Sequence, residues 1–136
     1  IIAALHEVQR GGALVADMMS FPVTAVHPDT PMVEIQHIME EERIRGVVVE
    51  EEDRLLGIVV LWDLKKLRMN KQWQSPVKAF MNRKVTTISP EALASEAAEL
   101  MVQKNIGHLP VVQGEKVIGI VTRTDIINYL YGMLPA

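Results

Sequence analysis

The segment GIVTRTDII, residues 119–127, places three chemically active side chains where the sequence pattern changes. Thr122 supplies a hydroxyl, Arg123 a cation and Asp125 a carboxylate, directly after an apolar run and before a helical one. A carboxylate has two acceptor oxygens, which suits a pair of neighbouring hydroxyls. A hydroxyl and the free amides at a helix start form a natural phosphate cradle, and Arg123 adds positive charge. The Thr-x-x-Asp spacing is also the form of a helix capping box, which alone would explain Thr122 and Asp125.

The elements that must position these residues occur twice. Sliding the chain by 62 residues aligns two halves without a gap, and 13 of the 50 positions in residues 15–64 are identical to their counterparts. In each half a β-branched strand ends at a proline, followed by a helix, two apolar strands joined by a tight turn, and a second helix. Each half is therefore predicted to be β-α-β-β-α. We expect Thr30 to cap the first helix, with Pro31 in its first turn, and Gly132 to end the last one.

One such unit has too little core to be stable alone, so the predicted fold class is α/β (α+β), with two pseudo-symmetric repeats packed sheet to sheet. We expect an N-terminal lead-in over residues 1–12, repeat 1 over 13–70 and repeat 2 over 71–136. The polar residues 65–76 carry the connection. Because the first residue is Ile1, we expect a segment of a longer protein.

Composition narrows the classes of function. The chain of 136 residues has no cysteine, which excludes disulfides, thiolate chemistry and cysteine-based zinc sites. The net charge of −3 argues against a dedicated nucleic-acid surface, although residues 1–68 carry −5 and residues 69–136 carry +2. The four histidines lack metal-ligand spacing, and no nucleophile has a paired base, so we expect no metal site and no catalysis by this segment. We also expect no membrane span and a cytoplasmic location.

The stretches VTTISPE, GHLPVV and GIVTRTD, in an ordered tandem pair, resemble those of a cystathionine-β-synthase (CBS) domain pair, also called a Bateman module. The resemblance covers residues 13–134. It implies clefts between the two halves that, in many members, bind adenosine-containing ligands such as AMP, ATP or S-adenosylmethionine. The family signature, Gly-apolar-apolar-Thr/Ser-x-x-Asp, is complete in the second copy. It implies that Asp125 accepts both ribose hydroxyls and that Thr122 lies near phosphate.

The resemblance also implies a side of the site that faces the base. Thr86, Thr87 and Ile88 correspond to the strand edge that lines the adenine side, although β-propensity explains them equally well. The backbone of His108 and Pro110 is expected to face the base, with packing as the alternative for the histidine.

The first copy departs from the signature. Asp63 is retained, but Val60 stands in place of the signature Thr, and Leu61 and Trp62 follow it. A phosphate would find neither a hydroxyl nor a cation there. This first site is therefore predicted to be degenerate, or to take only an uncharged or adenosine-like ligand.

The expected function is a regulatory module that binds an adenine nucleotide (AMP, ADP or ATP) or S-adenosylmethionine, with no cofactor required. The alternative is a ligand-free structural module that dimerises the parent protein. The resemblance implies a homodimer through the CBS helices, working with other domains of the parent chain. Pro76, Val77, Met81, the Thr-Arg-Thr-Asp run and Gly132 resemble the CBS pair of tRNA nucleotidyltransferase/poly(A) polymerase-type proteins, so the parent chain is expected to be of that type.

Overall fold

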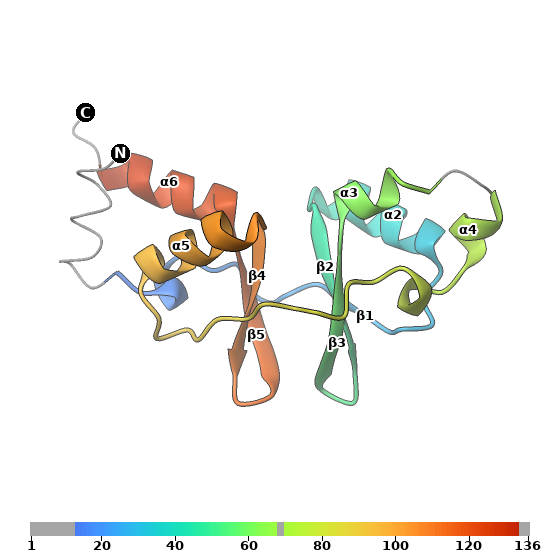
Figure 1. Cartoon of the computed structure of the whole chain (residues 1–136), viewed down its shortest axis with the longest axis horizontal. Helices are drawn as coiled ribbons and strands as arrows, with labels where there is room; N and C mark the ends of the chain where they lie inside the picture. The colour runs from blue at the N-terminus through green and yellow to red at the C-terminus, as the bar shows by residue number, and fades with distance from the viewer. Residues whose placement is uncertain (1–12, 68–69, 134–136) are drawn as a thin grey trace. The chain divides into compact units, whose positions relative to one another are not determined.

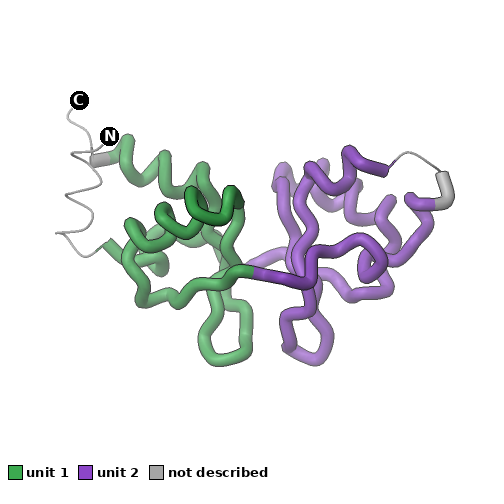
Figure 2. The backbone as a smooth tube through the Cα atoms, in the orientation of Figure 1, with its two compact units in different colours: residues 1–22, 86–136 green, residues 23–85 purple. Residues whose placement is uncertain are grey.

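The computed structural model describes residues 13–67 and 70–133 and has a mixed α/β architecture, which confirms the predicted fold class (Figure 1). The chain forms two compact units (Figure 2). Unit 1 is formed by residues 1–22 and 86–136, of which 13–22 and 86–133 are described, and unit 2 by residues 23–85. Each unit thus takes a short segment from the other sequence repeat. The sheet-to-sheet packing of the repeats stays a prediction.

Unit 2 is built on a three-stranded sheet with the order β1-β2-β3. Its strands are β1 (Ala25–Val26), β2 (Gly46–Glu51) and β3 (Arg54–Val60). Its helices are α2 (Met32–Glu42), α3 (Leu61–Leu64) and α4 (Asn70–Gln74), with a 3-10 turn η2 (Val77–Ala79). β1 runs parallel to β2, and β2 and β3 form the predicted hairpin. The polar connection between the repeats therefore contains a short helix, α4.

Unit 1 follows a similar plan around a two-stranded sheet, in which the strand predicted to begin repeat 2 is reduced to a single bridge between Ile88 and Val111. Its elements are η1 (Val15–Asp17), α5 (Ala94–Lys104), β4 (His108–Gln113), β5 (Lys116–Thr122) and α6 (Arg123–Met133). β4 and β5 pair antiparallel, and Gly114 in their turn has φ +65°, a conformation that glycine adopts without steric cost. The second predicted hairpin is therefore present.

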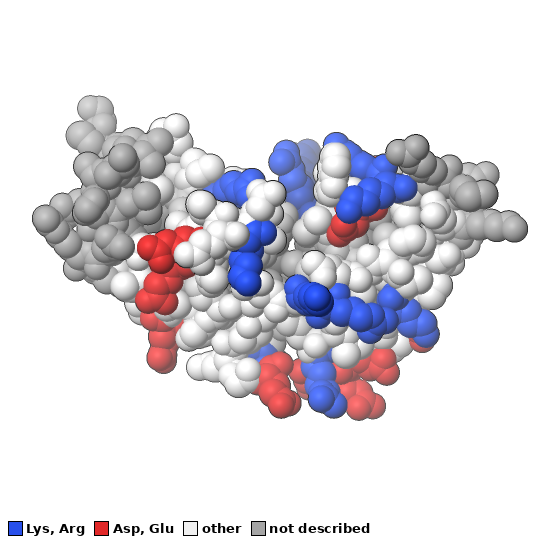
Figure 3. Space-filling view, viewed as in Figure 1, with Lys and Arg blue, Asp and Glu red and all other residues white. Residues whose placement is uncertain are grey.

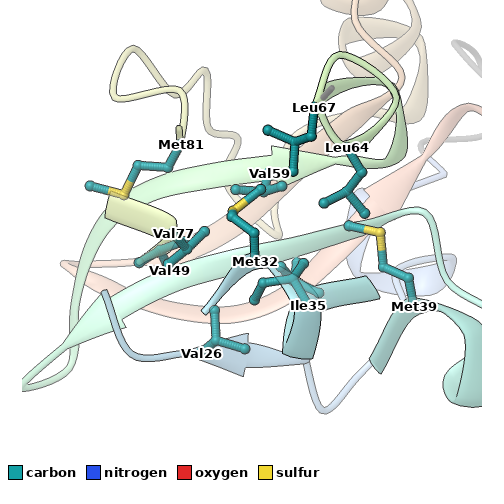
Figure 4. Close-up of a cluster of buried hydrophobic side chains, with 11 residues drawn as sticks. Val26, Met32, Ile35, Met39, Val49, Val59, Leu64, Leu67, Val77 and Met81 are labelled. Atoms are coloured by element: carbon teal, nitrogen blue, oxygen red, sulfur yellow. The ribbon is translucent and has the colours of Figure 1, made fainter. Parts of the chain in front are cut away.

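Each unit has its own apolar core. In unit 2, Met32, Ile35 and Met39 recur at helical spacing on α2 and are buried together with Val49 and Val59 of the sheet (Figure 4). Unit 1 has a separate cluster, whose fully buried members include Val15, Ala97, Leu109, Val111 and Val121. The apolar residues that recur along α2 and α5, the first helix of each repeat, therefore face the cores.

A close backbone approach explains the glycine that both repeats retain in their last strand. In unit 1, Ser20 and Ile120 exchange two backbone hydrogen bonds of 2.8 and 3.0 Å. A Cβ on Gly119 would lie 2.9 Å from the Ser20 carbonyl oxygen and 2.8 Å from Sδ of Met19. Gly57 is enclosed in the same way in unit 2. Only glycine leaves room for the neighbouring segment at this point of the strand.

Two predicted helix ends are wrong. The first helix of repeat 1 has Pro31, not Thr30, at its N-cap, with φ −67° and ψ 147°. No side chain caps this helix, because the proline side chain has no oxygen that could accept a hydrogen bond. Gly132 lies inside α6 and does not end it. Within the described ranges, no helix combines the length and the apolar character that crossing a membrane requires.

Candidate functional site

The junction between β5 and α6 is closed by a reciprocal pair of hydrogen bonds. The amide of Thr122 donates to Oδ2 of Asp125 at 2.8 Å, and the amide of Asp125 donates to Oγ1 of Thr122 at 3.1 Å. This is a capping box, the alternative that the sequence left open. It begins α6 immediately after the strand and fixes both side chains, which are partly buried.

The capping box leaves hydrogen-bonding capacity at the same place. A carboxylate has about four acceptor positions, and the cap uses one of them. Oδ1 of Asp125 has no partner within residues 13–67 and 70–133, and neither has the amide of Thr124 in the first turn of α6. The helix start therefore still offers one carboxylate oxygen to a hydroxyl and one amide to an anion, although fewer amides are free than the sequence suggested.

The side chain of Arg123 is used locally. Nη2 donates to the carbonyl oxygen of Ile106 at 3.1 Å, and the Arg123 amide donates to that of Gly107 at 2.9 Å. These bonds fasten the start of α6 to the turn that precedes β4. The guanidinium is exposed and remains positive, so it adds to the field at the helix start.

The predicted base-facing residues lie on β4 and along its free edge. His108 is paired directly with Thr122 across the hairpin. Ile88 bridges to Val111, donating to the Pro110 carbonyl at 3.0 Å and accepting from the Val112 amide at 2.9 Å. Thr86 and Thr87 directly precede Ile88, the residue that pairs with the edge of β4. β4 in turn pairs with β5, and the capping box lies at the end of β5.

Pro110 changes the hydrogen bonding of this edge relative to the other repeat. In unit 2 the equivalent residue is Val48, whose amide donates to the carbonyl of Thr24 at 3.2 Å. Pro110 has no amide hydrogen, so the carbonyl of Thr86, the counterpart of Thr24, has no such donor. No other donor to it is found among the described residues. The ladder therefore stops at Ile88, and an acceptor is left at the edge of the sheet.

At the corresponding junction in unit 2, both carboxylate oxygens of Asp63 have a neighbour within the unit. Oδ2 of Asp63 accepts the amide of Val60 at 3.0 Å, while Oδ1 lies 3.6 Å from Nζ of Lys66. Val60 has no hydroxyl to return the bond, and α3 is only four residues long. Asp63 thus makes the same cap bond as Asp125, but a lysine lies beside its second carboxylate oxygen.

Eight of the nine sequence-predicted residues belong to unit 1, and Asp63 belongs to unit 2. The unit 1 residues lie at the β5–α6 junction or on the edge of β4 and are Thr86, Thr87, Ile88, His108, Pro110, Thr122, Arg123 and Asp125. The sequence analysis expected free amides at this helix start, and the structure identifies the Thr124 amide as one of them. The Ile106–Gly107 turn was missed, because it acts through backbone carbonyls and carries no side-chain signal. In the described part of the chain, no group of three or more His, Asp or Glu side chains is placed to hold a metal ion.

Comparison with known proteins gives a family match over most of the chain. The family model described as CBS domain matches residues 15–70 and 77–132. The inosine-5'-monophosphate dehydrogenase of Aquifex aeolicus is 36% identical over 126 residues, 90% of this chain and 25% of that protein. The A-adding tRNA nucleotidyltransferase of Geobacter sulfurreducens is 26% identical over 116 residues, 85% of this chain and 13% of that protein. The chain thus spans a quarter or less of these two relatives.

Solved structures with the same fold include two determined with adenosine-type ligands. The CBS domain pair of protein MJ0100, in complex with 5'-methylthioadenosine and S-adenosyl-L-methionine, has a TM-score of 0.84 and 28% identity, covering 90% of this chain and 98% of that one. CBSX2 in complex with AMP has a TM-score of 0.78 and 25% identity, with coverage of 90% and 98%.

Proposed function

Because the chain belongs to the CBS domain family, as a tandem pair, we propose that it is a regulatory module that binds an adenine nucleotide at the β5–α6 junction of unit 1. The observation that carries this proposal is the open Oδ1 of Asp125 beside the unpaired amide of Thr124. In the other repeat the corresponding carboxylate oxygen, Oδ1 of Asp63, lies 3.6 Å from Nζ of Lys66, and Val60 supplies no hydroxyl. Two related CBS structures hold AMP or S-adenosylmethionine, which supports a ligand of this class.

Each group at the junction has a role that its chemistry allows. The Asp125 carboxylate accepts hydrogen bonds from the neighbouring hydroxyls of a ribose while Oδ2 keeps its cap bond. The Thr124 amide, at the positive end of the helix dipole, donates to a phosphate oxygen, and the charge of Arg123 favours the anion. The unpaired Thr86 carbonyl accepts from the exocyclic amino group of adenine. Asp63 is left with a structural role.

Ligand binding regulates only if two states of the protein bind the ligand with different affinity. We place the second state in the attached domains of a longer parent chain. A parent that acts on tRNA is supported by the nucleotidyltransferase relative, whereas the dehydrogenase relative shows that similar pairs occur beside other activities.

A second candidate function, a ligand-free dimerisation module, is favoured by one specific observation. Unit 1 exposes three large apolar side chains on its two helices: Val102 at 82%, Ile127 at 44% and Tyr131 at 64%. Large apolar side chains exposed on helix surfaces can belong to an interface with another protein.

A ligand panel separates the two candidates. Melting of the chain is followed by thermal shift with AMP, ADP, ATP and S-adenosylmethionine, and any hit is titrated by calorimetry. A ligand at one hundred times its Kd should stabilise the chain by about 2.7 kcal/mol. The ligand-free dimerisation module is the better account if none of the four ligands shifts the melting transition and if Tyr131→Glu converts a dimer into monomers in analytical ultracentrifugation.

A further inference from the structure

Unit 2 contains a pocket of about 610 Å³ that lies outside the junction just described. It is bounded by the C-terminal part of α2, the turn after it, α3 and α4. Small-molecule sites in proteins occupy roughly 300–1,000 Å³, so its size suits a small organic ligand.

The floor of the pocket is apolar. Its lining includes Met39, Ile44, Leu61, Leu64, Leu67 and Trp73. Met39 and Leu64 are 3% exposed and lie close together at one end of the unit 2 core (Figure 4). Trp73 of α4 is half-buried against the same cluster. A hydrocarbon chain or an aromatic ring placed here would cover the apolar side chains that are only partly buried, which are Ile44, Leu61 and Trp73.

The rim of the pocket is positively charged. Arg43, Arg45 and Lys65 line it, against a single acidic residue, Glu40. None of the three cations has a side-chain hydrogen bond or ion pair with any residue whose position is described. In Figure 3, Lys and Arg side chains gather over the part of unit 2 that carries α3. Uncompensated cations around an apolar floor complement a molecule with an apolar body and an anionic group.

The backbone conformation of Arg43 adds a second observation. Arg43 follows α2 with φ 56° and ψ 45°, a left-handed conformation that favours glycine or asparagine. Its counterpart after α5, Asn105, has nearly the same conformation with one of the favoured residues. The arginine therefore occupies a position for which backbone geometry alone gives no reason, which is consistent with a role for its charge.

The internal repeat provides a comparison within the molecule. Sixty-two residues after the three cations stand Asn105, Gly107 and Ile127, none of them charged. Glu40 is replaced by Val102, which is exposed. The same structural position is thus charged in unit 2 and apolar in unit 1, so the cationic rim belongs to one repeat and is not a requirement of the fold.

We propose that the unit 2 pocket binds a small amphipathic anion, with the apolar body on the Trp73 side and the anionic group at Arg43, Arg45 and Lys65. This site is separate from the β5–α6 junction and does not depend on the proposed nucleotide binding. A carboxylate at the end of a short acyl chain satisfies both requirements, since arginine pairs with carboxylates in a bidentate manner.

The test uses decanoate below its micelle concentration and the fluorescence of Trp73. Trp62→Phe removes the other tryptophan of the chain. Decanoate should change the emission saturably, whereas 1-decanol, which lacks the charge, and acetate, which lacks the chain, should bind at least tenfold more weakly. AMP should not displace decanoate.

Variants of the rim provide the matched controls. Arg43→Asn copies the unit 1 residue and should weaken decanoate binding several-fold, while its melting temperature stays equal or rises because the strain is removed. Adding Arg45→Gln and Lys65→Gln should extend the loss to tenfold or more, and Arg54→Gln, on the hairpin, should change nothing. Equal binding of decanol and decanoate, an unaffected triple variant, or displacement by AMP would overturn the proposal. Loss of the decanoate-induced change in Trp73 emission as the chain dimerises would also overturn it, because a second copy of the chain would then occupy the pocket.

Discussion

Replacing Asp125 with alanine separates the two roles that we give to its carboxylate. The variant loses a 2.8 Å hydrogen bond to the Thr122 amide. Capping interactions of this kind contribute about 0.5–2 kcal/mol, so we expect unfolding to become easier by roughly 1 kcal/mol. For a chain of this size that corresponds to a fall in Tm of roughly 2–6 °C. Asp63→Ala loses the equivalent 3.0 Å bond to the Val60 amide and should cost about the same, since the added contact with Lys66 is exposed.

Nucleotide binding should distinguish these two variants. Hydrogen bonds to a charged group contribute about 1.5–3 kcal/mol, so Asp125→Ala should raise the Kd for AMP by about tenfold to a hundredfold. Asp63→Ala should leave this Kd within a factor of about two. Calorimetric titration of both variants with AMP, at a temperature where each is folded, measures the difference. If both variants bind AMP as the wild type does, or lose affinity equally, the assignment of Asp125 to the ligand is wrong.

Three further predictions address the surrounding structure. Pro110→Val should restore the ladder bond to the Thr86 carbonyl, which hydrogen exchange would detect as a protected amide at residue 110, and AMP affinity should fall several-fold. Gly119→Ala places a Cβ 2.9 Å from a backbone carbonyl and should destabilise the chain by about 1–3 kcal/mol in urea unfolding; an unchanged midpoint would contradict the close approach. Lys78→Gln should raise the pKa of Asp29, because the hydrogen bond and charge of the lysine, 2.9 Å away, hold that pKa below its ordinary value. NMR titration of the Asp29 carboxyl measures this, and a pKa that does not move would contradict it.

Most of the fold could be predicted from patterns between residues close together in the sequence. The hairpins follow from turn chemistry and alternating apolar residues, and the first helix of each repeat from its apolar spacing. The Thr-x-x-Asp spacing left a capping box at Thr122 and Asp125 open as an alternative, and the structure contains it. The failed helix ends depended on Pro31, which fits either the N-cap or the first helical position, and on Gly132, which is exposed and which α6 includes as its penultimate described residue.

The features that could not be predicted depend on contacts between segments that are distant in the sequence. The unpaired Thr86 carbonyl follows from the register of Ile88 against β4, which the local sequence does not specify. The pocket of unit 2 depends on α4, a short helix in a stretch that reads as a polar connection. Both features arise where one repeat departs from the other, at Pro110 and around Arg43. Such differences become informative only once the two units are compared residue by residue.

The most direct measurement of the central proposal is an amide NMR titration of the chain with AMP. We predict saturable shifts that are largest for the amides of Thr122, Thr124 and Asp125, with those of Val60 and Asp63 nearly unchanged. Shifts concentrated at Val60 and Asp63, or no saturable shift at any amide, would contradict an adenine-nucleotide site at the start of α6.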